Sequence, residues 1–153
     1  MKIVLQNCLE ASVSIDGEIY SQINKGYVLL VSFTNGDDEE TCIKLAEKIT
    51  KLRIFMDENG KTNLSIKDVG GDILSISQFT LYADLKKGNR PSFVNYCLEP
   101  VRAKELYEFF NDKLKELGYN VKTGVFGADM KVALINDGPF TLVVDSEELK
   151  KWK

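Results

Sequence analysis

The sequence predicts an α+β domain, in which two main helices pack on a mostly antiparallel sheet or pseudo-barrel. Three observations predict this class. Short apolar runs bounded by turn residues recur along the chain and indicate strands, and Asp16-Gly17 stands between two of them as a two-residue hairpin signal. Two longer segments place apolar residues at helical spacing, which indicates amphipathic helices lying against the sheet.

The expected strands follow one another between short turns. They span 2–6, 11–15, 18–23, 27–33, 72–77, 119–123, 130–135 and 140–145. The run 27–33 is continuously apolar and therefore predicts a central strand. Residues 56–65 are expected to form a polar loop or a short hairpin. Gly70-Gly71 is expected to be a turn, because no phosphate-loop pattern accompanies these glycines.

The two expected helices are recognised by their apolar stripes. The first follows a turn at 35–38, and its stripe consists of Cys42, Leu45, Ala46, Ile49 and Leu52. The acidic residues 37–40 lie at its positive end, so we expect a capping role for them ahead of metal binding. The second helix opens at Pro100 and ends at Gly118, and its stripe consists of Ala103, Leu106, Tyr107, Phe110, Leu114 and Leu117.

The composition predicts one soluble domain. The chain has 153 residues, 44% hydrophobic and 28% charged, which fits a single domain over 1–153 with a charged tail at 146–153. A net charge of −3 argues against broad nonspecific binding to nucleic acid but leaves room for a local basic path. No run approaches the roughly 20 apolar residues of a membrane span, and the start of the chain turns polar too early for a signal peptide. We therefore expect a cytoplasmic protein with no membrane partner.

Cysteine and histidine usage restricts the chemistry. Cys8, Cys42 and Cys97 are far apart and not in metal-ligand spacing, so reduced core thiols are expected, and neither a metal nor another cofactor. The chain contains no histidine. The commonest general base and the commonest zinc ligand are therefore both missing, as is every Ser–His or Cys–His pair.

Two polar motifs follow apolar runs and are candidates for a site. Residues 77–81, Ser-Gln-Phe-Thr-Leu, follow the run 73–76, and residues 136–141, Asn-Asp-Gly-Pro-Phe-Thr, follow 132–135. Small polar residues at strand ends are where sites are usually built. Glycine lacks a Cβ and proline fixes φ, and an X-Pro bond can be cis at small cost. Gly138-Pro139 can thus form a rigid corner that lines a pocket sensitive to shape.

The motifs together resemble the D-aminoacyl-tRNA deacylase family, over nearly everything before about residue 145. The matching runs are 11–13, 53–55 with Asp57, Gly60, Lys61 and Asn63, 77–81, 90–93, 123–124, 126–130 and 136–139. The resemblance implies the family's fold, a homodimer, and an editing hydrolase that cleaves D-aminoacyl-tRNA and glycyl-tRNA mischarged on tRNA-Ala. The substrate-binding residues that it implies are Ser77, Gln78, Phe79, Thr80, Phe126, Met130, Asn136, Gly138, Pro139 and Thr141.

Ester hydrolysis needs a positioned water, donors for the developing oxyanion, and a base or proton shuttle. The backbone N–H groups around Phe79 and Thr80 can hold an oxyanion. Thr80 is the candidate nucleophile by residue type, but no base stands beside it in the sequence, which leaves its hydroxyl poorly activated. The resemblance implies another solution, in which the terminal 2′-hydroxyl of the tRNA assists the reaction.

Selectivity is expected to come from shape. The resemblance implies that Gly138-Pro139 is a cis wall opposite residues 77–80, which rejects an L side chain and accepts hydrogen in its place, and therefore also accepts glycine. The alternative for this step is an ordinary turn. The resemblance also implies that Phe126 stacks on the terminal adenine, where a core role is the alternative. Lys86, Lys87 and Arg90 form a basic loop that either contacts the acceptor stem or is simply solvated.

The chain departs from the family at position 7, where the usual arginine that helps hold the Gly-Pro corner is replaced by Asn7. Two other functions stay open on the sequence alone. One is the related branch of the superfamily that edits L-aminoacyl-tRNA, against which the intact motif at 77–80 argues. The other is a tRNA- or nucleotide-binding module without catalysis, which the missing general base suggests.

Overall fold

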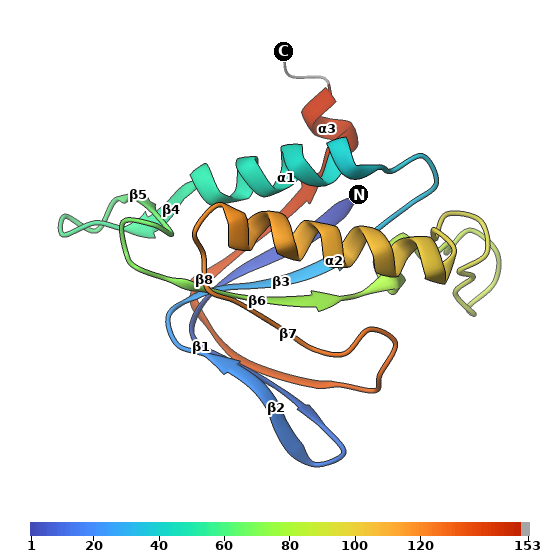
Figure 1. Ribbon diagram of the computed structural model, residues 1–153, viewed down its shortest axis with the longest axis horizontal. Coiled ribbons are helices and arrows are strands. Elements are labelled where there is room, and N and C mark those ends of the chain that lie inside the picture. The colour runs from blue at the N-terminus through green and yellow to red at the C-terminus, as the bar shows by residue number, and fades with distance from the viewer. Residues whose placement is uncertain (151–153) are drawn as a thin grey trace.

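The computed structural model describes residues 1–150 and places two long helices over one face of a curved sheet (Figure 1). The helices are α1 (Glu39–Lys51) and α2 (Pro100–Glu116). The sheet strands are β1 (Lys2–Ile15), β2 (Glu18–Ile23), β3 (Gly26–Ser32), β6 (Asp72–Ser77), β7 (Val121–Thr123) and β8 (Lys131–Asp145). The two-layer arrangement confirms the predicted α+β class.

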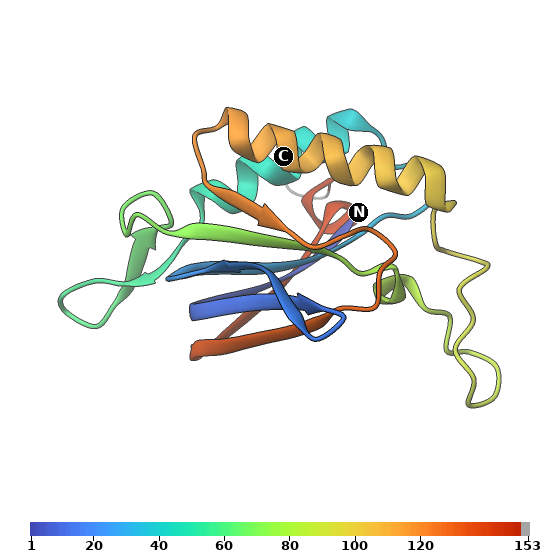
Figure 2. The same ribbon diagram turned by 60° about the horizontal axis from the view of Figure 1, so that its bottom comes forward.

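The strand order explains both the sheet and its curvature. The order is β2-β1-β3-β6-β7, and β8 pairs with β1 as well. β1 is antiparallel to β2, β3 and β8, whereas β6 is parallel to both β3 and β7. The hydroxyl of Ser21 on β2 donates to the carbonyl of Thr123 on β7 at 2.7 Å. The sheet therefore curls until its far strands meet, which gives the pseudo-barrel seen edge-on in Figure 2.

Four of the expected strands merge into two. The expected strands 2–6 and 11–15 form the single strand β1, and 130–135 and 140–145 form β8. Both mergers have the same cause, because the register between β1 and β8 shifts twice, between Gln6 and Cys8 and again between Cys8 and Ala11. Bulges of this kind let a strand continue past residues that have no partner. The second motif consequently lies inside a strand rather than after one.

The acidic cluster before α1 divides into different roles. Asp38 caps the helix and accepts from the N–H of Thr41 at 2.9 Å, and this bond lowers the pKa of the Asp38 carboxyl. Glu39 instead pairs with Arg102 of α2 at 2.9 Å and so ties the two helices together. Asp37 binds the amino terminus. Within residues 1–150 no group of acidic, cysteine or histidine side chains could hold a metal ion.

The core has two parts. The larger lies between the sheet and the helices, and the smaller lies inside the curl of the sheet around Val28, Leu74 and Ile76. Cys8 and Cys42 are buried there as predicted, and burial raises the pKa of their thiols to about 11 and about 12. Cys97 is only half-buried, so the prediction of a core thiol is wrong for this residue.

Three shorter elements complete the chain. β4 (Arg53–Met56) and β5 (Thr62–Ser65) form the short hairpin that was one of the two expectations for 56–65. Within the expected charged tail at 146–153, residues 146–150 form the helix α3 (Ser146–Lys150). Ser146 is buried and Leu149 packs on the core, while residues 151–153 of the expected tail lie outside the described chain. No helix within 1–150 is long and apolar enough to cross a membrane.

Candidate functional site

The first motif begins where β6 leaves the sheet. The buried run 73–76 carries β6 through the core, and the N–H of Gln78 donates to the carbonyl of Val31 at 2.7 Å. After this bond the chain turns into a short 3-10 helix, η1 (Phe79–Tyr82). A buried strand thus delivers the polar residues of the motif to the surface in a fixed position.

Polar groups of the motif face outward and are ordered by each other. The Nε2 of Gln78 donates to the Oγ1 of Thr80 at 2.6 Å. Among the described residues, the structure pairs neither the N–H of Phe79 nor that of Thr80 with an acceptor. Two unpaired N–H groups at the start of a helical turn can both donate to a developing oxyanion.

Phe79 is held by its backbone and exposes its ring. Its carbonyl accepts from the hydroxyl of Ser32 at 3.3 Å and from the thiol of Cys97 at 3.4 Å. The ring is 56% exposed and meets Phe93 edge-on, with 5.1 Å between the ring centres. Ser32, Phe93 and Cys97 were not candidates from the sequence, since only the folded chain brings them to the motif.

Cys97 is the one thiol beside the motif among residues 1–150, but its chemistry is unfavourable. A nucleophilic cysteine needs a low pKa, which usually comes from a nearby cation or a helix N-terminus. Here burial raises the pKa of the Cys97 thiol, and the thiol donates to the carbonyls of Phe79 and Tyr82. We therefore assign Cys97 a role in holding the motif.

The loop after β7 reaches the same edge of the sheet. β6 and β7 are parallel and adjacent, with Ser75 paired to Thr123, so the residues after both strands leave the sheet side by side. A side chain at Gly124 would collide with the sulfur of Met130, so this glycine makes room for Met130. The space beside Gly124 is therefore occupied by Met130.

Phe126 lies beside a hollow of about 320 Å³. Its ring is half-buried and is 6.0 Å from the ring of Tyr107 on α2. The hollow is lined among others by Asn111, Thr123 and Gly124. Phe126 thus packs partly on the core and partly faces an open space, while stacking on the terminal adenine stays a prediction.

The second motif forms a wide bulge in β8. Gln6 pairs with Thr141 and Cys8 pairs with Asn136, so residues 137–140 all face the single residue Asn7. Asn136 braces the bulge, because its Oδ1 accepts from the N–H of Phe140 at 2.9 Å and its Nδ2 donates to Thr141 at 2.8 Å. Within the bulge the Gly138-Pro139 bond is cis and both residues are exposed.

The two motifs do not face each other within one chain. The row of paired residues at the end of β6 is Ser77–Val31–Ile3–Val144, whereas the bulge lies four rows away, beside Asn7. Rows are about 3.3 Å apart and strands about 4.8 Å, so the separation across three strands is roughly 20 Å. The expectation that the corner stands opposite residues 77–80 is therefore wrong for a single chain, because the sheet register fixes it elsewhere.

Asn7 does not take over the role expected for an arginine at this position. Its side chain is buried and its Nδ2 donates to the carbonyl of Ile54 on β4 at 2.7 Å. Its Oδ1 is buried without a hydrogen-bond partner among the described residues. The bulge is thus braced by Asn136, from within its own strand.

The basic loop after the motif is only partly free. The Nζ of Lys86 donates to the hydroxyl of Tyr96 at 2.8 Å and lies over the Tyr96 ring. Lys87 and Arg90 are exposed. Figure 1 shows this yellow-green loop extending beyond the sheet at the end where β6 ends.

A family model described as D-Tyr-tRNA(Tyr) deacylase matches residues 4–145. The chain belongs to this family. A protein of Lactobacillus delbrueckii subsp. bulgaricus named D-aminoacyl-tRNA deacylase is 59% identical over 145 residues, which is 95% of this chain and 99% of that one. A protein of the same name from Bacillus cytotoxicus is 55% identical over 147 residues, or 96% of this chain and 100% of that one.

Two solved structures share the fold of this chain. The protein titled c-Myc DNA Unwinding Element Binding Protein superposes with a TM-score of 0.88 at 36% identity, over 95% of this chain and 98% of that one. A structure titled as a probable eukaryotic D-amino acid tRNA deacylase superposes with a TM-score of 0.82, over 94% of this chain and 97% of that one. It is 16% identical and therefore supports the fold alone.

Proposed function

We propose that this chain is an editing hydrolase that cleaves the ester of D-aminoacyl-tRNA. The observation that carries the proposal is the family match over residues 4–145, which includes both polar motifs. In the reaction, water attacks the ester carbonyl and the bond from that carbon to the ribose oxygen breaks. The amino acid leaves as an acid, and the ribose oxygen takes up a proton.

The unpaired N–H groups of Phe79 and Thr80 are the donors for the oxyanion of this reaction. Such donors typically contribute about 10²–10³-fold each to a rate, because they stabilise charge that exists only in the transition state. The backbone around them is fixed by the bonds to Val31 and to the Phe79 carbonyl. This fixed geometry supports a catalytic role for the two backbone N–H groups, which no side-chain pattern in the sequence marks.

The base is proposed to come from the substrate. The chain has no histidine, and the hydroxyl of Thr80 accepts a bond from the amide of Gln78, which is not a base. A vicinal 2′-hydroxyl is already next to the ester by covalent geometry, so its assistance needs no further positioning. Thr80 is accordingly proposed to shape the site and not to form a covalent intermediate.

The selectivity gate is proposed to be Gly138-Pro139 from a second copy of the chain. Within one chain the corner and the first motif are roughly 20 Å apart by strand spacing, so only another copy can bring them together. A bare backbone corner excludes an L side chain by clash and admits a hydrogen. Glycyl esters, including glycyl-tRNA-Ala, therefore pass the same gate.

The terminal adenosine is proposed to lie against Phe126, beside the hollow shared with Tyr107. Stacking of a base on an aromatic ring contributes about 1–3 kcal/mol. Met130 lies against Gly124 and is proposed to shape this loop for the substrate. Lys87 and Arg90 are exposed cations on the loop after η1 and are proposed to contact acceptor-stem phosphates.

Paired D- and L-tyrosyl-tRNA, hydrolysed by the purified protein, test the proposal. We expect the D-substrate to be cleaved at least about 100-fold faster, since steric exclusion acts on one isomer only. Faster cleavage of the L-substrate would assign the chain to the L-selective branch. Tight binding of either substrate without turnover would make it a binding module.

The dimer proposed for the gate has its own test. β8 pairs only with β1 among the described residues, and its Val143 is 65% exposed on the face turned away from the core side chains of Leu142 and Val144. We expect a dimer by sedimentation at micromolar concentration, and Val143→Asp should shift it toward monomer. Val101→Asp, at a 69% exposed site on α2, is the matched control and should leave the dimer intact. Sedimentation as a monomer throughout would contradict a gate supplied by a second copy.

A further inference from the structure

A buried hydroxyl from α2 reaches the strand that carries the first motif. Tyr107 is 4% exposed, and its hydroxyl donates to the carbonyl of Ser75 on β6 at 2.6 Å. Burial raises the pKa of this hydroxyl, so it keeps its proton and remains a hydrogen-bond donor at neutral pH. The bond therefore ties the helix layer to β6 just before the motif begins at Ser77.

Ser75 is the residue at which β6 loses one of its two neighbouring strands. The pairing of β6 with β3 continues as far as Ser77, but its pairing with β7 ends where Ser75 lies beside Thr123. Beyond Ser75 the strand is paired on one side only. The Tyr107 hydroxyl contacts β6 at this last residue with a strand on both sides.

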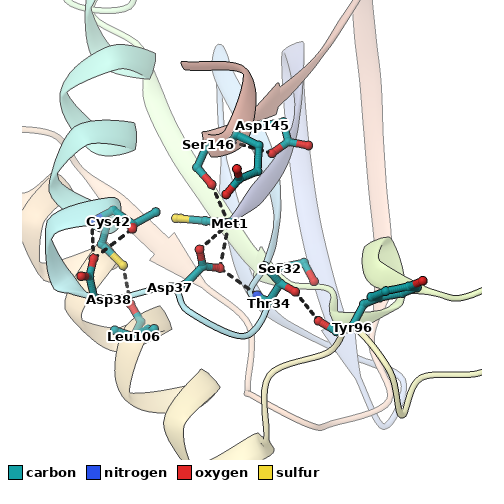
Figure 3. A network of polar contacts seen from close by, with 12 residues as sticks. Met1, Ser32, Thr34, Asp37, Asp38, Cys42, Tyr96, Leu106, Asp145 and Ser146 are labelled. Atoms are coloured by element: carbon teal, nitrogen blue, oxygen red, sulfur yellow. Dashed lines mark hydrogen bonds and ion pairs between the residues drawn. The ribbon is translucent and has the colours of Figure 1, made fainter. Parts of the chain in front are cut away.

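The β3 side of the motif has supports of its own. The hydroxyl of Ser32 donates to the carbonyl of Phe79 at 3.3 Å. The turn after β3 adds a bond from the hydroxyl of Thr34 to the carbonyl of Tyr96 at 2.5 Å, as Figure 3 shows. These bonds hold the motif and the loop after it from the side of β3, whereas Tyr107 holds β6 from the helix layer.

The ring of Tyr107 has a second contact, with the loop that follows β7. Its centre is 6.0 Å from the centre of the Phe126 ring, and the two rings are tilted by 45°. One side chain thus touches both segments that leave the sheet side by side. Because the hydroxyl and the ring contact different segments, Tyr107→Phe removes the bond to β6 and keeps the contact with Phe126.

The polar groups around the Tyr107 hydroxyl are unfavourable for a packed core. The Oγ of Ser75 and the Oδ1 of Asn111, which lies next to Tyr107 on α2, are both buried without a hydrogen-bond partner among the described residues. Buried polar atoms that lack a partner destabilise the folded chain. Such a cluster adds little to packing, and its position beneath the first motif gives it a use there.

We infer that Tyr107 is a positioning residue for the hydrolysis, whose hydroxyl fixes the end of β6 and thereby the N–H groups of Phe79 and Thr80. The inference rests on the proposed function, which assigns these two N–H groups to the oxyanion. Tyr107 acts through β6 and not on the ester itself. Its effect on the rate is large because a misplacement of about 1 Å in a reacting geometry can cost about 10²-fold.

The test compares Tyr107→Phe with Tyr27→Phe in the hydrolysis of D-tyrosyl-tRNA. Tyr27 is the matched control, because its buried hydroxyl also donates to a backbone carbonyl, that of Ile49 at 3.3 Å. Tyr27 pairs with Ile73, at the other end of β6 from the motif. Each variant should melt about 2–6 °C lower than the parent, since each loses one buried hydrogen bond.

The two variants should differ in their kinetics. We expect Tyr107→Phe to lower kcat at least about tenfold and to keep KM within about threefold, because it disturbs the oxyanion donors and not the contact with Phe126. Tyr27→Phe should keep kcat and KM within about twofold of the parent. An unchanged kcat in Tyr107→Phe, or an equal fall of kcat in both variants, would make Tyr107 an ordinary core residue and overturn the inference.

Amide hydrogen exchange gives a readout that needs no substrate. The N–H of Gln78 donates to the carbonyl of Val31, so its exchange rate reports how firmly the motif is held. We expect this N–H to exchange at least about tenfold faster in Tyr107→Phe than in Tyr27→Phe. If the parent does not hydrolyse D-tyrosyl-tRNA, the proposed function fails, and the exchange rate still decides whether Tyr107 holds the motif. Equal exchange in the two variants overturns the inference whatever the hydrolysis shows.

Discussion

Substrate that ends in 2′-deoxyadenosine will be hydrolysed about 10²–10⁴-fold more slowly than the ribose form, the range that a lost acid–base group usually costs. The physical reason is that the chain has no histidine, and the one thiol beside the motif among residues 1–150 has a raised pKa. The measurement is single-turnover hydrolysis of 3′-linked D-tyrosyl-tRNA with either terminal nucleotide. Single turnover is needed because it separates the chemical step from product release.

Thr80→Ala is the companion variant. If the tRNA hydroxyl assists the reaction, this variant keeps its rate within about tenfold, because it loses only the bond from Gln78 that orders the motif. Leu85→Ala, at a 70% exposed position on the neighbouring loop, is the control for nonspecific damage. A folded but inactive Thr80→Ala, or an acyl group trapped on Thr80, would replace the substrate-assisted mechanism with a protein nucleophile.

Local patterns predicted most of the elements well. The strand at 72–77 and the hairpin at Asp16-Gly17 are found with the expected bounds, since both are encoded by short-range signals. β8 could not be predicted as one strand, because a Gly-Pro pair usually ends a strand and only pairing with β1 reveals the bulge. α3 was missed for a similar reason. Its charged sequence looks solvated, and Ser146 is buried by contacts with Met1, at the other end of the chain.

The site shows the same division between local and long-range information. Residues 77–80 could be proposed as site residues from the sequence alone because a buried strand ends there. Ser32, which fixes the Phe79 carbonyl, comes from a distant segment and carries no signal of its own. Phe93, which flanks the Phe79 ring, lies in the matching run 90–93, but nothing in the sequence places it beside Phe79. The position of Gly138-Pro139 relative to this motif depends on register across three strands, so the motif was recognisable in the sequence but its place was not.

Gly138→Ala will reduce hydrolysis of D-aminoacyl-tRNA by roughly 10- to 200-fold, the range that one added methyl group costs in a closely fitted pocket. Gly138 has a φ of +136°, a backbone conformation that L side chains rarely adopt. A Cβ there would lie 3.0 Å from the nitrogen and 3.2 Å from the Cβ of Phe140. The methyl group would thus narrow the gate and shift the bulge, while the exposed position lets the rest of the chain fold.

Two further variants separate the gate from a general loss of stability. In Gly118→Ala the alanine also has to adopt a positive φ, here +98°, but nothing lies within 4 Å of the added Cβ. Gly118 follows α2 and is not part of the bulge. This variant should lose a similar stability of about 1–3 kcal/mol and keep full activity. Asn136→Ala removes the hydrogen bonds to Phe140 and Thr141, so the Gly138-Pro139 corner should loosen. Hydrolysis of L-aminoacyl-tRNA should therefore rise. If Gly138→Ala and Asn136→Ala both fold and leave the hydrolysis rates of D- and L-substrates unchanged, the corner takes no part in chiral selection. A steric gate would respond both to the added methyl group at position 138 and to the loss of the Asn136 hydrogen bonds.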